Sequence, residues 1–307
     1  MKYLWKGSFV DKEDIHIDLH DRGYQFGDGI YEVTHVYNGV LFALDEHIDR
    51  LINSAAFIEL NLRHTKDEIA AFCRGLVEQN HIENGYIYLQ VTRGDGTLRN
   101  HGFSMYEEQQ PVFCGFAQSS TRSEEKMVKG ADAITVEDRR SLMCNVKSLN
   151  LLPNCLAKHA AQKKGVSKAI MVRDNIVTEE KSGNIFIVKD GIVLTHPNGG
   201  KILPGITKQL IIELLHQHNI PVWEKEFSEE ELLHADEVIN KGAGDCGPPG
   251  KRGNQGYLEF CPHGFGGTGG RGGGERTPVR EPDASFLPGQ QHVRPAGGEK
   301  ECVKVNV

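Results

Sequence analysis

YEVTHVYNGVLFALD, at residues 31–45, predicts a strand, a tight turn, a second strand and the start of a helix. β-Branched and aromatic residues dominate Tyr31–Tyr37, and Asn38-Gly39 supplies the two positive φ angles that a two-residue hairpin turn needs. Asp45 is a candidate N-cap for a helix that extends to about Leu60. A hairpin that leads into a helix indicates an α+β fold.

The same mixture of elements fills a small N-terminal domain, which we predict at residues 1–118. Three further strands are expected there, at Tyr3–Val10, Tyr86–Arg93 and Pro111–Ala117. Thr65 and Glu68 have the spacing of a capping box for a helix that ends near Asn80. The polar, Ser-rich stretch at 118–125 has the composition of a linker between domains.

A second, larger domain is predicted at residues 119–240, since 307 residues are enough for two cores. Strands are expected at Ala133–Glu137, at Lys168–Arg173, and in a hairpin over Ile185–Leu194 that turns at Asp190-Gly191. A helix is expected at Leu151–Lys164, where Gly165 ends it. A second is expected after Gly205, and its apolar face contains Leu210, Ile211, Leu214 and Leu215. A third is expected after Ser228, which has the spacing of a capping box with Glu231.

The composition changes abruptly after Asn240. The last 66 residues, from Gly242, hold 17 Gly, 7 Pro, two Leu and no Ile, which is too little apolar side chain for a packed core. Residues 241–307 are therefore predicted to be an atypical segment. Its G-x-G-x-x-G string at Gly267, Gly269 and Gly272 follows no predicted strand, so we interpret it as chance and not as a dinucleotide site.

Charge and cysteine content restrict the class of protein. A formal net charge of −7 argues against a nucleic-acid binder, which needs a surplus of Lys and Arg. No apolar run approaches membrane length, and Met1–Ile17 contains no apolar signal core. Seven cysteines without a C-x-x-C pair predict neither disulfides nor a metal site. These features favour a cytoplasmic protein that binds a small molecule.

Four features are candidates for chemistry, and each has an ordinary structural alternative. Lys147 lies in a largely apolar stretch, although a surface lysine is the commoner case. Gly205-Ile206-Thr207 begins a helix, whose N–H groups can bind a phosphate or simply start the helix. Arg50 can serve the same phosphate or pair with Glu46, four residues earlier. Glu179 is either a functional acid or a solvated loop residue.

Four blocks of sequence together resemble a known family. They are DRGYQFGDGIYE at 21–32, EHIDRL at 46–51, VKSLN at 146–150 and LPGIT at 203–207. In this order and setting the chain resembles the fold-type-IV pyridoxal-phosphate-dependent aminotransferases, most closely those of bacterial D-amino-acid metabolism, from about Tyr3 to Ile239. The resemblance implies a two-domain α+β enzyme that works as a homodimer, with pyridoxal phosphate in the cleft between its domains.

By this resemblance, Lys147 carries the cofactor as a Schiff base and moves a proton between the substrate α-carbon and the cofactor. Glu179 faces the pyridine nitrogen and keeps the ring protonated. The remaining roles fall to Arg50 and the N–H groups of Ile206 and Thr207 at the phosphate, to Ser182 at the cofactor, and to Tyr31 at the substrate pocket.

The expected substrate class depends on Arg99 and His101, in the loop after the strand that ends at Arg93. D-Amino-acid aminotransferases that resemble this chain have an Arg-x-His here, which reaches across the dimer to the substrate α-carboxylate; an exposed loop pair is the alternative. The resemblance implies ping-pong transamination between D-amino acids such as D-alanine and 2-oxo acids such as 2-oxoglutarate. Branched-chain L-aminotransferases, aminodeoxychorismate lyases of the same fold, and an inactive or impaired protein are the alternatives.

Two departures from the family pattern bear on the cofactor site. Glu180 and Lys181 stand before Ser182, where the family has small residues. After Ile239 a Ser/Thr pair normally completes the phosphate site, and here the chain continues as Asn240-Lys241-Gly242. The second departure coincides with the change in composition.

We predict that the sequence after about Ile239 arises from a reading-frame shift, or an equivalent error, in the gene. Out-of-frame reading of GC-rich codons yields Gly, Pro and Arg. Ile239-Asn240-Lys241 can be encoded by ATC-AAC-AAG-G, which one base later encodes Ser-Thr-Arg, a pair of the kind that is missing. Sequencing of the coding DNA should reveal an alternative frame with apolar strands and this pair. If that frame encodes neither, the segment is native.

Overall fold

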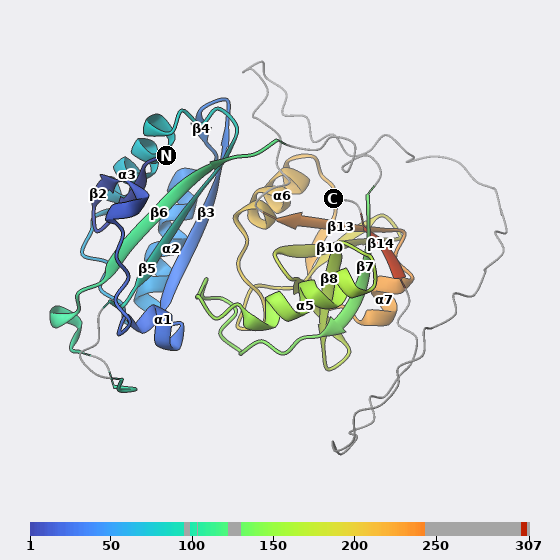
Figure 1. Ribbon diagram of the computed structural model, residues 1–307. Helices are drawn as coiled ribbons and strands as arrows, with labels where there is room; N and C mark the ends of the chain where they lie inside the picture. Colours follow the sequence, from blue (N-terminus) through green and yellow to red (C-terminus); the bar gives the residue numbers. More distant parts are fainter. Residues whose placement is uncertain (95–98, 103, 122–129, 243–301, 306–307) are drawn as a thin grey trace.

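The structure is a computed structural model that describes residues 1–94, 99–102, 104–121, 130–242 and 302–305. Two bodies, each made of a sheet and helices, lie side by side (Figure 1). The predicted α+β class is confirmed. Among the described residues, no helix combines the length and the apolar composition needed to cross a bilayer.

The N-terminal body is a six-stranded antiparallel sheet with the order β2-β1-β6-β5-β3-β4. Its strands are β1 (Tyr3–Trp5), β2 (Ser8–Val10), β3 (Gly29–Tyr37), β4 (Val40–Leu41), β5 (Gly85–Thr92) and β6 (Val112–Ser119). Its helices are η1 (Lys12–Asp14), α1 (Arg22–Phe26), α2 (Leu44–Phe57), α3 (Lys66–Gln79) and η2 (Tyr106–Glu108). The long helices α2 and α3 pack on the sheet through a core that includes Ile48, Leu51, Ile69 and Leu76.

The second body is an eight-stranded mixed sheet with the order β12-β11-β10-β9-β8-β7-β14, and β13 pairs with β10. Its strands are β7 (Ala131–Glu137), β8 (Lys168–Arg173), β9 (Ile176–Glu180), β10 (Gly183–Lys189), β11 (Ile192–Thr195), β12 (Val222–Glu224), β13 (Glu237–Gly242) and β14 (Cys302–Val305). Its helices are α5 (Leu152–Lys163), α6 (Ile206–Gln217) and α7 (Glu229–Leu233). Separate apolar clusters join α5 to β7 and β8, and α6 to β10 and β11.

Local signals predicted most of these elements. Both hairpin turns have the expected left-handed backbone, with φ of 50° at Asn38 and 75° at Gly39, and 51° at Asp190 and 75° at Gly191. Both predicted capping boxes, after Thr65 and after Ser228, are present. These features could be predicted because their geometry depends on neighbouring residues alone.

Three details of the prediction are wrong. Ala43, and not Asp45, is the N-cap of α2, and Asp45 lies in the first turn, where its charge favours the positive helix end. That helix ends at Phe57, short of the predicted Leu60. The single strand predicted over Tyr3–Val10 is instead a hairpin, because Lys6 and Gly7 adopt positive φ angles. Each error concerns where a segment turns, which depends on its packing.

The predicted division into domains stays a prediction. Gln118 and Ser119, at the start of the predicted linker, are the last residues of β6, and residues 122–125 lie outside the described residues. Within the segment 241–307, the structure describes the end of β13 and the strand β14, which pairs antiparallel with β7 from Val305↔Ala131 to Cys302↔Ile134. The G-x-G-x-x-G string lies outside the described residues.

One crossing of the chain positions the site between the two bodies. Residues 146–149 leave the second body and lie along β3 of the first: Tyr31 N–H donates to the Lys147 carbonyl at 2.9 Å, and Leu149 N–H donates to the Gly29 carbonyl at 3.0 Å. An isolated antiparallel bridge joins Ile30 and Ser148. A backbone fixed on both sides of Lys147 holds that residue at the junction of the two bodies.

Candidate active site

A cavity of about 780 Å³ lies between the two bodies, and both contribute to its wall. The N-terminal body provides side chains of β3 and α2, and the second body provides the segment 140–154, the turn between β9 and β10, and the start of α6. Seven of the predicted site residues line it: Tyr31, Arg50, Lys147, Glu179, Ser182, Ile206 and Thr207. Distant parts of the sequence thus meet in one cavity.

Lys147 enters this cavity from the crossing segment. Its Nζ lies 4.3 Å from the centroid of the Tyr31 ring, within the range of a cation–π contact. Its backbone N–H donates to Ser54 Oγ at 3.4 Å. Because Lys147 is half-buried and lines the cavity, it is not the exposed surface lysine that the ordinary alternative describes.

Arg50 is a buried cation that links the two bodies. Its Nη2 donates to Glu32 Oε1 at 2.7 Å, and its Nη1 donates to the Pro204 carbonyl at 3.1 Å. Glu46 is exposed, so the surface ion pair that was the alternative for Arg50 is wrong. His47 Nδ1 also lies 3.0 Å from Glu32 Oε2. One carboxylate on β3 therefore holds two side chains of α2 against the cavity.

The start of α6 forms the opposite wall. The helix begins at Ile206 after Gly205, and no side chain caps it, so the positive end of its dipole faces the cavity. A Cβ at Gly205 would lie 2.0 Å from Asn184 Oδ1. A side chain at residue 205 would displace Asn184, which bonds to Glu179 and to the Leu203 carbonyl, so glycine is favoured at this close approach of the helix start to β10.

Glu179 is a buried residue of β9, and the alternative of a solvated loop acid is wrong. Its Oε2 accepts hydrogen bonds from Asn184 Nδ2 at 3.2 Å and from Leu203 N–H at 3.0 Å, and its Oε1 accepts one from Arg140 Nη1. Burial raises the pKa of Glu179 to about 7, against the opposing effect of the Arg140 guanidinium. The Arg140 guanidinium thus favours the ionised form of Glu179, which burial opposes.

Glu180 and Lys181, which depart from the family pattern, neutralise each other. Lys181 Nζ lies 3.0 Å from Glu180 Oε1, and Glu180 Oε2 accepts hydrogen bonds from both the N–H and the hydroxyl of Ser182 at 2.9 Å. The polar groups of Ser182 are thus engaged by Glu180. Asn240, at the second departure, also lines the cavity, and its Oδ1 accepts a hydrogen bond from Lys168 Nζ at 2.7 Å.

Arg99 and His101 are exposed and lie outside this cavity. Both contact Phe26 of α1: the Arg99 guanidinium lies 4.8 Å from the ring centroid, and the His101 ring lies 5.5 Å from it. Arg22 fixes the loop through its Nη1, which donates to the carbonyl of Asn100 at 2.7 Å. Within one chain, the structure does not bring Arg99 and His101 to the other predicted residues.

The sequence analysis missed Glu32, which binds Arg50 beside the cavity, and Arg140, which lines it. Glu32 belongs to the quoted block 21–32 but has no motif of its own. Arg140 follows Arg139, and local sequence cannot distinguish them, yet Arg140 is 8% exposed and Arg139 is 72% exposed. Burial assigned by tertiary packing is what separates such neighbours.

The ion pair of Glu32 gives a prediction on pH dependence. Burial alone would raise the pKa of Glu32, but Arg50 and His47 outweigh it and lower that pKa from 4.5 to about 2. A lowered pKa means that the carboxylate stabilises the folded state above about pH 4.5 and loses this effect as pH falls toward 2. We expect Glu32→Gln to lower the free energy of unfolding at pH 7 by about 3 kcal/mol.

Urea denaturation at pH 7, 4 and 3 measures this effect. The wild-type protein should lose more stability between pH 7 and 3 than Glu32→Gln does, because the variant lacks the titrating group. Glu46→Gln, an exposed change on the same helix, is the control and should resemble the wild type. Equal acid sensitivity of Glu32→Gln and wild type would contradict the assignment.

Comparisons with known proteins agree with this geometry. The model of the amino-transferase class IV family matches residues 29–246. A D-alanine aminotransferase of Listeria monocytogenes is 45% identical over 239 residues, which are 78% of this chain and 83% of the relative. One from Staphylococcus epidermidis is 44% identical over 238 residues, 78% of this chain and 84% of the relative.

Solved structures share the fold. The branched-chain aminotransferase of Thermoproteus uzoniensis, solved with norvaline, has a TM-score of 0.72 and 27% identity, and covers 80% of this chain and 84% of its own. The branched-chain amino acid aminotransferase of Escherichia coli has a TM-score of 0.72 and 26% identity, with 79% and 83% covered. This chain therefore belongs to the amino-transferase class IV family and is an aminotransferase of the fold-type-IV architecture that its sequence predicted.

Proposed function

We propose that this aminotransferase transfers amino groups between D-amino acids, such as D-alanine, and 2-oxo acids, such as 2-oxoglutarate, in a ping-pong reaction. The observation that carries the proposal is the meeting of Lys147, Glu179 and Arg50 in one cavity between the domains. The relatives that match most of the chain at 44–45% identity are D-alanine aminotransferases, which favours D-amino acids.

The cavity fits pyridoxal phosphate, the cofactor of this family. Lys147 offers an amine for the aldehyde, and Glu179 offers a buried carboxylate for the ring nitrogen. Arg50 and the uncapped start of α6 offer a cation and a helix dipole for the phosphate. Ile206 and Thr207, the first residues of α6, line the cavity, so their backbone N–H groups can reach an anion there.

Pyridoxal phosphate supplies an aldehyde that exchanges amines and a ring that accepts electrons. Lys147 Nζ would bind the cofactor and, once released, take the proton from the substrate α-carbon and return it, because a neutral amine is both nucleophile and base. The Glu179 carboxylate would hold a proton at the ring nitrogen, and Tyr31 would close the substrate side. Ser182 would contribute less than expected, because Glu180 engages its polar groups.

The proposal includes a homodimer that completes the substrate site. Arg99 and His101 are exposed beside α1, and Asn150 Nδ2 donates to the Gly27 carbonyl of α1 at 3.3 Å, which places the start of α5 next to the same helix. Large apolar side chains are exposed here, including Tyr24 and Leu152 at 73% and 70%. A second copy docked on this region would bury them and could receive Arg99 in its own cavity.

A Lys147→Ala variant tests the cofactor assignment. The wild type with added pyridoxal phosphate should show the absorbance of a lysine-bound cofactor and exchange the α-proton of D-alanine with solvent. Both signals should vanish in Lys147→Ala, since no other residue is proposed to take both roles. Lys163→Ala, an exposed change on α5, should keep them. Unchanged absorbance in Lys147→Ala would refute the assignment.

An Arg99→Ala variant tests the substrate site. The KM for D-alanine and for 2-oxoglutarate should rise by about tenfold or more, with cofactor affinity nearly unchanged, because a charge-assisted bond to the α-carboxylate is lost. Mixing Lys147→Ala and Arg99→Ala subunits should restore activity, since a shared dimer would contain one site with both native residues. No recovery in mixed dimers would place Arg99 outside the partner's site.

A further inference from the structure

Arg140 is a buried charge in the cavity wall to which the proposed function assigns no role. It lies in the loop between β7 and Lys147. Its Nη1 donates to Glu179 Oε1, while its Nη2 and Nε donate to the two oxygens of Asp138 at 2.8 and 2.9 Å. A guanidinium held by two parallel bonds to one carboxylate has a fixed direction toward the other.

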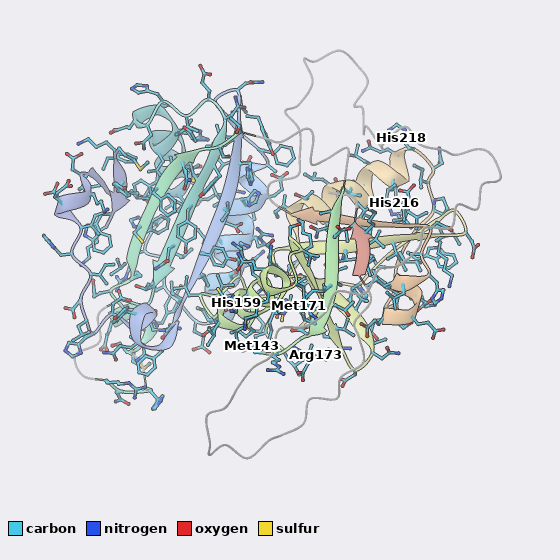
Figure 2. All side chains as sticks on the ribbon, turned by 45° about the vertical axis from the view of Figure 1, so that its right-hand side comes forward. Met143, His159, Met171, Arg173, His216 and His218 are labelled. Carbon is cyan, nitrogen blue, oxygen red and sulfur yellow. The ribbon has the colours of Figure 1, made fainter. Side chains whose placement is uncertain are left out.

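Asp138 is itself fixed from behind. Its side chain is fully buried, accepts a hydrogen bond from the Thr178 hydroxyl at 2.8 Å, and lies 3.2 Å from the Arg173 guanidinium. Figure 2 labels Arg173 at the end of β8, together with Met171 on the same strand. Although burial opposes it, Arg140 lowers the pKa of Asp138 to about 2, so Asp138 stays anionic. Opposite charges therefore alternate from Glu179 through Arg140 and Asp138 to Arg173.

The hydrogen bonds of Glu179 leave little of its carboxylate open. A carboxylate accepts about four hydrogen bonds, two at each oxygen. Oε2 already accepts two, from Asn184 and Leu203. Oε1 accepts one, from Arg140. Within the described part of the chain, the position left for the cofactor ring is thus on the oxygen that Arg140 binds.

Charged and titratable groups from several elements face Glu179. Arg140 and the neutral Cys144 thiol approach from the loop after β7, and Lys147 approaches from the crossing segment. The groups that bond to it from β10 and from the loop before α6 are neutral. Because burial raises the pKa of Glu179 to about 7 even beside Arg140, removal of that cation would leave the carboxyl protonated at neutral pH.

We infer that Arg140 is a positioning residue for Glu179. It holds the carboxylate in one orientation and favours its ionised form, so that the open position on Oε1 can accept a hydrogen bond from the ring nitrogen of the cofactor. Asp138 limits this effect, since its negative charge offsets part of the charge of Arg140. Only the identity of the ring rests on the proposed function, because the charge relation among these three residues exists without cofactor.

Two substitutions should change Glu179 in opposite directions. The full chain, free of cofactor and labelled with carbon-13 at the glutamate carboxyls, is titrated by NMR, and Glu179→Gln identifies the signal. The titration midpoint of Glu179 should rise by about one pH unit or more in Arg140→Gln and fall in Asp138→Asn. In Arg140→Lys, which keeps the charge, the titration midpoint of Glu179 should rise less. In Arg139→Gln, a change at the exposed neighbour, the midpoint should equal that of the wild type.

Binding of pyridoxal phosphate provides the second measurement. At pH 7.5, Arg140→Gln should bind it about tenfold more weakly than Arg139→Gln, because a protonated Glu179 no longer attracts the ring nitrogen. A wild type that does not bind the cofactor would defeat the proposed function and leave the NMR result to decide this inference. Shifts of the same sign in Arg140→Gln and Asp138→Asn, or none, would overturn it. If Arg140→Gln does not fold, the direction in Asp138→Asn decides.

Discussion

The ion pair between Arg50 and Glu32 is the interaction on which the junction of the two bodies depends. Glu32 belongs to β3 and Arg50 to α2, so the pair is internal to the N-terminal body, yet Arg50 also bonds to the Pro204 carbonyl just before α6. Buried charges are costly unless they are paired and hydrogen-bonded, and both of these charges are. The same guanidinium therefore joins β3 to α2, contacts the second body at Pro204, and leaves a cation at the cavity.

Lys147 lies at the same junction and is held there by backbone hydrogen bonds. Its backbone bonds to β3 of the N-terminal body, while its flanking segments belong to the second body. A reactive group held by backbone bonds on both sides keeps its position as long as both bodies stay folded, which is the arrangement that a cofactor enzyme needs. The carboxylate of Glu179 enters from the second body, so a bound ring would be contacted from both sides of the cavity.

The two departures from the family pattern differ in how much of the structure they affect. Glu180 and Lys181 form an internal pair that removes net charge from the cavity wall, and Glu180 engages Ser182, so the change affects one proposed cofactor contact while β9 and β10 still form. The C-terminal departure is larger: the family match ends at residue 246, close to the point where the composition changes. Reduced cofactor retention is the physical consequence that we propose, because each missing hydrogen bond to a phosphate removes about 1.5–3 kcal/mol.

The sequence by itself determined the elements whose geometry is local, and four blocks of it determined the family. Asn38-Gly39 specifies its turn and Thr65 its cap, because neither depends on distant residues. Only the tertiary structure decided which charged side chains are buried against one another at the cavity. Arg139 and Arg140 are adjacent in sequence, but only the second is buried against Glu179. The exposure of Arg99 within one chain likewise follows from packing. Electrostatic roles depend on burial and on partners far along the chain, and local sequence contains neither.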